Sequence, residues 1–322
     1  MISIATKGIE DIIVGYDAEI IDHWQMVEKG LVTYNSTLTD AKEKNYLNHL
    51  LALGKEIITA NTKRLNDLKK EFGKIISASD MKSKKRKVFR NTLIELMGYA
   101  NLRSTFYPKY FFKVGIKTCV YCNALLTVVV ERAMVLGKSK GYQAKFQADH
   151  YLPKKEYPCF SISIFNLYPV CANCNIVKGV KKVSFNLYSD VNKHHQSPFS
   201  FRLSNGCKAK FLLSRNLDDI VIEFDEPIPP KGHEKFDDLF SIKGTYATQR
   251  DVAADLILKA EAYPLSYRNT LLTSLPKIFQ NKSVVNRLIT GNYAEESDIH
   301  KRPLAKFTLD IAYQIGLLKK DP

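Results

Sequence analysis

Two pairs of cysteines, each with the spacing Cys-x-x-Cys, constrain the fold of this chain more than any other feature. The pairs are Cys119 with Cys122 and Cys171 with Cys174. Two thiolates separated by two residues can reach one tetrahedral zinc ion from a tight turn, so two such pairs indicate a structural metal site. Residues 123 to 170 separate the pairs, whereas a plain zinc ribbon has roughly 15 to 20 residues there. The sequence therefore predicts a four-cysteine zinc clamp with further structure between its halves.

Polar residues that could take part in catalysis or bind a metal ion lie in and just after this interval. They are Asp149, His150, Asn166, Asn175 and Lys178. Their order around the cysteines resembles the HNH endonucleases, the ββα-metal nucleases of the zinc-clamped kind. That family has a Cys-x-x-Cys pair, an acidic residue with His, an Asn, a second pair, then His or Asn and often Lys. The last family position is Asn175 here instead of His, and the resemblance covers roughly residues 115 to 182.

The resemblance implies a role for each of these five residues. His150 would be the general base, since an ordinary pKa of about 6.5 suits proton removal near neutral pH. Oxygens of Asp149 and Asn175 suit a hard divalent cation, Mg²⁺ or Mn²⁺. Adjacent side chains on a strand point to opposite faces, so His150 is not expected to share that ion. Asn166 would orient the loop that carries His150, and Lys178, one helical turn after Asn175, would meet a phosphate.

The predicted fold class is α+β, with a ββα HNH module and its zinc clamp embedded in a larger, mainly helical chain. We divide the chain into a helical N-terminal region, 1–100, the nuclease module, 101–183, and a mixed β then helical C-terminal region, 184–322. The two outer regions would bind a substrate or a partner.

Apolar spacing predicts the elements around the module. Between about Thr39 and Ser77, apolar residues recur every three or four positions, which predicts one long amphipathic helix capped by Asp40. Short strands are expected at 127–130, 142–148, 199–203, 210–213 and 220–224. Helices are expected from Thr248 onward, the last of them over 305–318, and another helix should open near Asn175.

The chain is basic, with 48 Lys and Arg against 33 Asp and Glu and a formal net charge of +15. Such a field attracts polyanions; nucleic acid is the first candidate and an anionic membrane surface is the competitor. The charge is concentrated in one run, which contains Lys82, Lys84, Lys85, Arg86, Lys87 and Arg90. This run is either a patch that contacts phosphates or an ordinary solvated face.

The remaining features predict a protein of the cytoplasm. Cys159 and Cys207 lie outside the pairs and are expected to be buried thiols without a disulfide, which fits a reducing compartment. The N-terminus lacks the apolar core of a signal peptide, and the most apolar run, 124–136, is too short and too charged to span a membrane.

The sequence thus predicts a metal-dependent endonuclease that hydrolyses phosphodiester bonds, with DNA favoured over RNA. The alternative is a non-catalytic zinc module that binds nucleic acid or protein, and a nuclease of the homing or restriction type that works alone would differ only in target and partner. The layout also resembles HNH proteins of bacterial antiphage defence, both Septu-like and retron-linked, in which an ATPase is the usual companion. That resemblance implies a partner ATPase.

Overall fold

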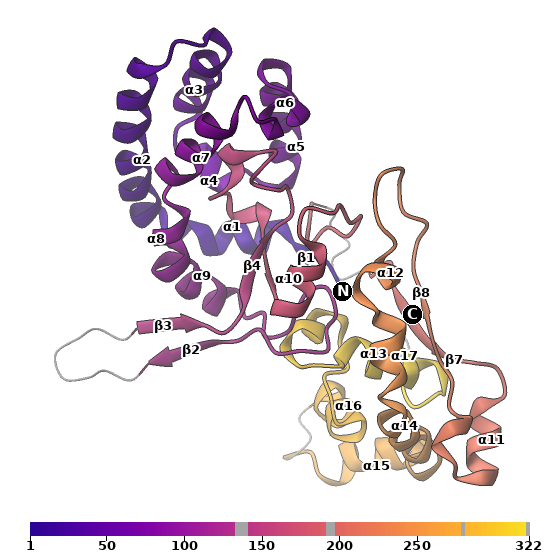
Figure 1. Ribbon diagram of the computed structural model, residues 1–322. Coiled ribbons are helices and arrows are strands. Elements are labelled where there is room, and N and C mark those ends of the chain that lie inside the picture. The colour runs from indigo at the N-terminus through magenta and orange to yellow at the C-terminus, as the bar shows by residue number, and fades with distance from the viewer. Residues whose placement is uncertain (133–140, 191–196, 278–280, 320–322) are drawn as a thin grey trace.

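A small antiparallel hairpin followed by a helix occupies the centre of the chain in this computed structural model (Figure 1). Strand β4 (Gln147–His150) pairs with β5 (Leu167–Val170), which sets Asp149 opposite Tyr168. Helix α10 (Ala172–Lys178) follows directly and packs against β4. All four residues of β5 are buried. The structure describes residues 1–132, 141–190, 197–277 and 281–319.

Helices make up the first third of the chain and lie above and to the left of the hairpin in Figure 1. They are α1 (Thr6–Val14), α2 (Asp17–Thr37), α3 (Ala41–Leu53), α4 (Glu56–Thr59), α5 (Thr62–Ile75), α6 (Ala78–Lys82), α7 (Lys87–Leu96), α8 (Tyr99–Ser104) and α9 (Phe106–Val114). Their apolar faces, with Leu47, Leu68 and Leu93 fully buried, join the core that also contains the hairpin. The N-terminal region is therefore helical, as predicted.

The single long helix expected between Thr39 and Ser77 is wrong. Three helices, α3, α4 and α5, replace it because Gly54 takes a positive φ of 62° that ends α3. The side chain of Asn61 then caps a new helix by accepting from the Arg64 backbone N–H. The cap at the start is as predicted, since Asp40 accepts from the backbone of Lys42 and Glu43.

A second hairpin leaves the central one on the side of α9. It consists of β2 (Val129–Arg132) and β3 (Gly141–Ala144), which pair antiparallel, and both strands pack against α9. Aromatic rings pack together at this contact. The ring centroids of Phe112 and Tyr142 are 5.0 Å apart, and those of Phe111 and Phe146 are 5.2 Å apart. The strand predicted at 127–130 is confirmed as β2, whereas the single strand predicted at 142–148 is divided between β3 and β4, which belong to separate sheets.

The C-terminal region is mixed, as predicted. Its strands are β6 (Tyr188–Ser189), which pairs in parallel with β1 (Ile4–Ala5), and β7 (Ser200–Leu203), which pairs antiparallel with β8 (Ile222–Asp225). Its helices are α11 (Cys207–Ser214), α12 (Phe236–Phe240), α13 (Ile242–Ala247), α14 (Arg250–Ala262), α15 (Leu265–Ser274), α16 (Lys282–Thr290) and α17 (Ala305–Gln314). Short 3-10 turns are η1 (Pro158–Phe160), η2 (Ile164–Asn166), η3 (Leu217–Asp219) and η4 (Glu296–Lys301).

One strand predicted in this region is wrong, because residues 210–213 belong to helix α11. The segment has no β-branched residue, and its buried side chains, Cys207 and Phe211, are four positions apart on one helical face. The strands expected near 199–203 and 220–224 are confirmed as β7 and β8, and the last helix as α17.

The two cysteines outside the pairs are buried and free, as predicted. Cys159 accepts a hydrogen bond from the Tyr46 hydroxyl at 2.9 Å, and burial raises the pKa of Cys159 to about 12. Among the described residues, none of the helices has the length and apolar character that crossing a bilayer requires.

Candidate active site beside a four-cysteine cluster

The four paired cysteines converge on one point. The Sγ atoms of Cys119, Cys122, Cys171 and Cys174 all lie within 4.8 Å of one another, and all four residues are buried. A tetrahedral zinc ion with Zn–S bonds of about 2.3 Å requires neighbouring sulfurs about 3.8 Å apart. Burial is the largest cause that raises the pKa of the Cys119 thiol, and a bound cation would favour the thiolate form. The donor set therefore fits a structural metal ion such as zinc.

The C-terminal region supports the first cysteine turn through Asn123, which is fully buried and has a φ of 52°. The Asn123 side chain donates to Thr118 Oγ1 and to the Ile299 carbonyl, and it accepts from the Lys306 backbone N–H. The hydroxyl of Tyr246 also donates to the Cys122 carbonyl at 2.8 Å. The cluster is thus built into the whole chain and is not an isolated knuckle.

Asp149, the predicted carboxylate ligand, is buried and already has two polar partners. Its Oδ2 accepts from the Tyr121 hydroxyl at 2.7 Å and from Lys178 Nζ at 2.9 Å, and its Oδ1 lies 3.1 Å from the same Nζ. Lys178 also donates to the His150 carbonyl at 3.2 Å. The expectation that Lys178 meets a phosphate is therefore corrected, because its side chain is 1% exposed and its ammonium neutralises Asp149.

His150 ends β4 with its ring held in one orientation. Its Nε2 lies 2.9 Å from the Ser161 carbonyl, and since a carbonyl only accepts, Nε2 carries the proton and Nδ1 has the free lone pair. Burial, reinforced by the positive charge of Lys154, lowers the pKa of His150 to about 3. The ring is therefore neutral at physiological pH, although its basicity is weaker than the ordinary value assumed from the sequence.

Asn166 makes the predicted backbone hydrogen bonds to the loop after His150. Its Oδ1 accepts from the Leu152 N–H at 2.6 Å, and its Nδ2 donates to the carbonyls of Leu152 and Phe160. The Tyr151 N–H donates to the Asn166 carbonyl at 2.9 Å. Being 1% exposed, Asn166 cannot reach a substrate and acts by fixing this loop.

Asn175 lies in the middle of α10 and is half-buried. Its Nδ2 donates to Gln147 Oε1 at 2.5 Å. This bond directs the amide nitrogen toward β4 and leaves Oδ1 as the oxygen without a described hydrogen bond. The amide therefore keeps an acceptor for an external ligand.

A pocket of about 370 Å³ lies beside β4 and α10. Asp149, His150 and Asn175 line it together. Asp149 and His150 share the pocket although they are neighbours in the chain, because His150 ends β4 and the chain then turns toward Pro153. Cations also line the pocket: Arg103, Lys154 and Lys155. The pocket is thus lined by an imidazole, by two side chains with oxygen atoms that can bind a metal ion, and by three cations. This lining suits an anionic substrate.

Sequence reasoning missed several of these residues. Tyr121 lies inside the first cysteine pair, and Lys154 closely follows His150, so their positions near the motif were a usable signal. Arg103 and Tyr99 come from α8, far from the motif in sequence, and no local pattern marks them. The Tyr99 ring lies 4.7 Å from the His150 ring and 4.6 Å from Lys154 Nζ, so Tyr99 helps to position both groups.

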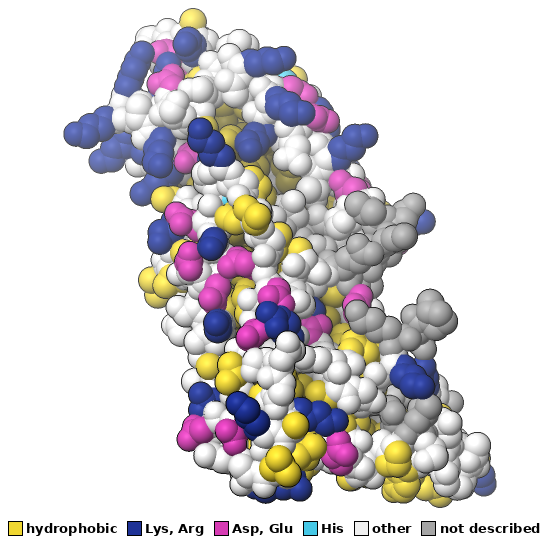
Figure 2. Space-filling model, turned by 90° about the vertical axis from the view of Figure 1, so that its right-hand side faces the viewer, with side chains coloured by type: hydrophobic (Ala, Val, Ile, Leu, Met, Phe, Trp, Pro, Cys, Tyr) yellow, Lys and Arg dark blue, Asp and Glu magenta, His cyan; other side chains and the backbone are white. Residues whose placement is uncertain are grey.

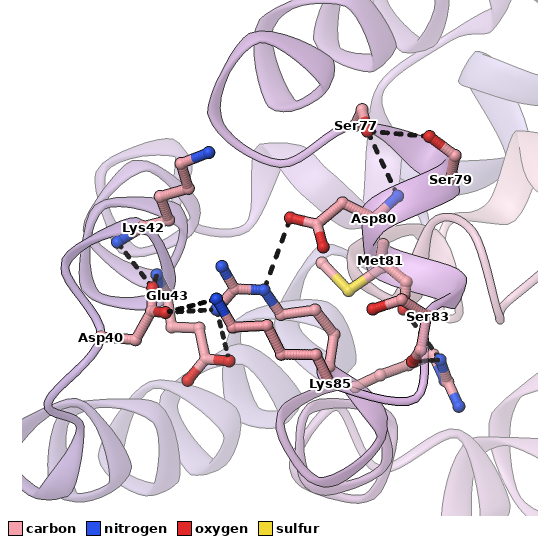
Figure 3. Close-up of polar contacts among 11 residues, drawn as sticks. Asp40, Lys42, Glu43, Ser77, Ser79, Asp80, Met81, Ser83 and Lys85 are labelled. Atoms are coloured by element: carbon pink, nitrogen blue, oxygen red, sulfur yellow. Dashed lines mark hydrogen bonds and ion pairs between the residues drawn. The ribbon is translucent and has the colours of Figure 1, made fainter.

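Two of the six residues predicted to contact phosphates, Arg86 and Arg90, are buried, and the other four are exposed. The prediction is therefore corrected for these two arginines. Arg86 is 2% exposed and lies 2.9 Å from Asp40 and 2.7 Å from Glu43, with Asp80 at 3.5 Å. Figure 3 shows these three carboxylates arranged around one guanidinium. Arg90 is also buried and donates to the carbonyl of Met81. Arg86 and Arg90 therefore hold helices together and are not available to a nucleic acid.

We expect Arg86→Ala to lower the free energy of unfolding by roughly 1.5–3 kcal/mol, the usual contribution of hydrogen bonds to charged groups. Lys85→Ala is the matched control, since the Lys85 side chain is 72% exposed and lies 3.8 Å from Asp40; its effect should stay within about 0.5 kcal/mol. Urea titrations of both variants measure the difference. Equal effects would contradict the assignment of Arg86 as the internal link.

The four lysines of the run are exposed: Lys82, Lys84, Lys85 and Lys87. Lys82 Nζ lies 3.5 Å from Glu156 Oε1, in the loop that also contributes Lys154 and Lys155 to the pocket. Figure 2 shows Lys and Arg side chains gathered over the upper part of one face, where the N-terminal helices lie. The exposed lysines therefore contribute to the positive surface of the N-terminal helices.

Comparison with known proteins gives no match: no family model, no curated protein and no solved structure matches this chain. The functional argument therefore depends on the site itself.

Proposed function

We propose that this chain is a metal-dependent endonuclease of the HNH, ββα-metal kind that hydrolyses phosphodiester bonds in nucleic acid. The observation that supports it most is that His150, whose Nδ1 is unprotonated, lines one pocket together with Asp149, Asn175 and three cationic side chains. The order of the β4–β5 hairpin and α10 beside the cysteine cluster supports the proposal, because a strand, a second strand and a helix are expected of this class.

In the proposed reaction, water attacks the phosphorus and His150 Nδ1 takes its proton. The bond from phosphorus to the 3′ oxygen breaks, and the leaving oxygen is protonated from solvent, which yields a 5′-phosphate and a 3′-hydroxyl. The bond from Nε2 to the Ser161 carbonyl holds the ring while Nδ1 gains the proton. A phosphate in the pocket also raises the pKa of His150 above its value in the free protein, because a nearby anion favours the imidazolium.

Asp149 and Asn175 would hold the divalent cation, Mg²⁺ or Mn²⁺. When bound, this ion would neutralise charge that develops on the phosphate and the leaving oxygen. Lys178 already compensates the charge of Asp149, and with three further cations around the pocket the protein alone attracts a dication weakly. We therefore expect the cation to bind together with the anionic substrate.

The alternative, a non-catalytic zinc module, accounts for the cysteine cluster and the positive charge. It gives no reason for a neutral imidazole with an unprotonated Nδ1 in the lining of a pocket that Asn175 also lines. The geometry therefore favours an enzyme. A partner ATPase and a role in antiphage defence stay predictions from the resemblance, because no described contact bears on them.

Plasmid DNA and total RNA, each incubated with the purified protein in Mg²⁺, Mn²⁺ or EDTA, test the proposal. Cleavage that requires the divalent cation is expected, and Asn175→Ala should raise the cation concentration needed for half-maximal rate because it removes one oxygen ligand. Absence of cleavage of both polymers under every metal condition would contradict the proposed function.

Changing the four exposed lysines of the basic run to Gln should weaken nucleic-acid binding and leave the rate at saturating substrate nearly unchanged. Each lost phosphate contact should reduce the slope of log affinity against log salt by roughly 0.7 to 0.9. Binding at three salt concentrations measures this slope.

The matched control changes four exposed lysines of the C-terminal region to Gln. They are Lys210, Lys231, Lys243 and Lys277. Both variants lose the same net charge, so an equal change of slope in the two would indicate a general charge effect and contradict a specific patch at residues 82–87.

A further inference from the structure

A second pocket, of about 470 Å³, adjoins the first. It lies between α8, α9 and the segment from β3 to β4, and it shares Arg103 and Ala148 with the pocket of His150. Ala148 directly precedes Asp149 on β4. A nucleic-acid strand bound with one phosphate in the first pocket would therefore place the adjacent nucleotide in the second pocket.

The walls of this second pocket consist largely of rings and small apolar groups. Tyr107, Pro108, Tyr142 and Phe146 line it. These walls are held firmly: the Tyr107 hydroxyl donates to the Ile162 carbonyl at 2.8 Å, and Tyr142 and Phe146 pack on rings of α9. Pockets of roughly 300–1,000 Å³ typically hold small ligands, so this one has room for a ring system.

The charge at the junction of the two pockets identifies the kind of ligand. None of the described residues that line the second pocket is acidic, and the exposed Arg103 stands where the two pockets meet. A guanidinium there would pair with a phosphate, while the rings beyond it would contact a flat, apolar face. A nucleotide carries these two features next to each other.

We propose that the second pocket binds the nucleobase of the nucleotide adjacent to the scissile phosphate, and that the substrate is therefore single-stranded or locally unpaired. This inference rests on the proposed function for the position of the scissile phosphate. A base inside a duplex has both faces covered by its neighbours, so it must leave the stack before side chains can contact its face.

The experiment uses end-labelled single-stranded DNA and RNA oligonucleotides with the full-length protein. Product lengths locate a scissile bond, and two further oligonucleotides then carry an abasic residue on one side or the other of that bond. For the wild-type protein we expect the abasic residue on one side to lower kcat/KM at that bond about 5- to 100-fold, the usual effect of one base–aromatic stack. A matched duplex should be cut more slowly than the single strand.

Two variants remove the pocket in different ways. Tyr142→Ala deletes one wall, and Ala100→Trp, at an exposed wall position of α8, fills the space without removing a core contact. In both, the abasic residue should have little further effect. Tyr142→Phe should behave like the wild type, and so should Tyr267→Ala, which removes a ring 45% exposed on α15, outside both pockets.

Binding of the same oligonucleotides in EDTA separates the possible failures. If cleavage is insensitive to abasic residues on both sides and equal for duplex and single strand, the second pocket does not bind a nucleobase, while the proposed nuclease activity stands. Base-dependent, Tyr142-dependent binding without any cleavage supports the pocket and overturns the nuclease. Neither cleavage nor base-dependent binding overturns both.

Discussion

Replacing His150 with Ala should reduce the cleavage rate by about 10² to 10⁴-fold, the typical loss when a general base is removed. The reason is the proposed role of Nδ1, which is unprotonated because Nε2 donates to the Ser161 carbonyl, on a residue that lines the pocket. Rates of plasmid or oligonucleotide cleavage at saturating substrate measure the effect. Affinity for nucleic acid and bound zinc should hardly change, since His150 contributes to neither.

His49→Ala is a suitable control, because that imidazole pairs with Glu71 on the helical region and its side chain is 30% exposed. It should cleave at the wild-type rate. Undiminished cleavage by a folded His150→Ala protein would remove His150 from the mechanism.

The pH profile gives a second check on the same residue. The base must be neutral to accept a proton, and the pKa of His150 in the free protein is lowered to about 3. On lowering the pH, kcat/KM, which reports the free enzyme, should therefore not fall through protonation of His150 until the pH approaches 3. A loss of kcat/KM with a midpoint near 6.5, the ordinary value for His, would show that the ring is solvated in solution.

Replacing Cys171 with Ser should eliminate most of the bound zinc, which we expect at about one ion per chain, and should unfold the region around the hairpin. Structural zinc in small domains contributes roughly 10–16 kcal/mol of apparent binding free energy, whereas a whole domain is stable by only about 5–15 kcal/mol. Loss of one of four thiolates therefore removes a large share of the stability. Metal analysis and thermal unfolding measure the two effects.

Cys207→Ser is the matched control, because Cys207 is equally buried but lies outside the cluster. It should keep its zinc. A Cys171→Ser protein that retains one tightly bound zinc and the wild-type unfolding temperature would contradict the assignment of the cluster as a metal site.

The sequence by itself determined the features that depend on short spacings. Within each Cys-x-x-Cys pair, the short spacing already brings the two thiolates close together. Only the two pairs then had to come together in the fold to form the cluster. The bonds of Asn166, the cap at Asp40 and strands β7 and β8 were also predictable, because each involves residues close in the sequence or a repeating pattern.

Only the tertiary structure decided which charges face solvent and which are internal. Arg86 and Lys87 are neighbours in the same basic run, yet one is enclosed by carboxylates from α3 and α6 and the other is exposed. Lys178 likewise bonds Asp149 instead of a substrate, and burial moves the pKa of His150 far from its ordinary value. Helices α8 and α9 supply Arg103 and Tyr107 to the two pockets. Burial and long-range pairing depend on which distant segments pack against a residue, and no local spacing in a single sequence encodes that.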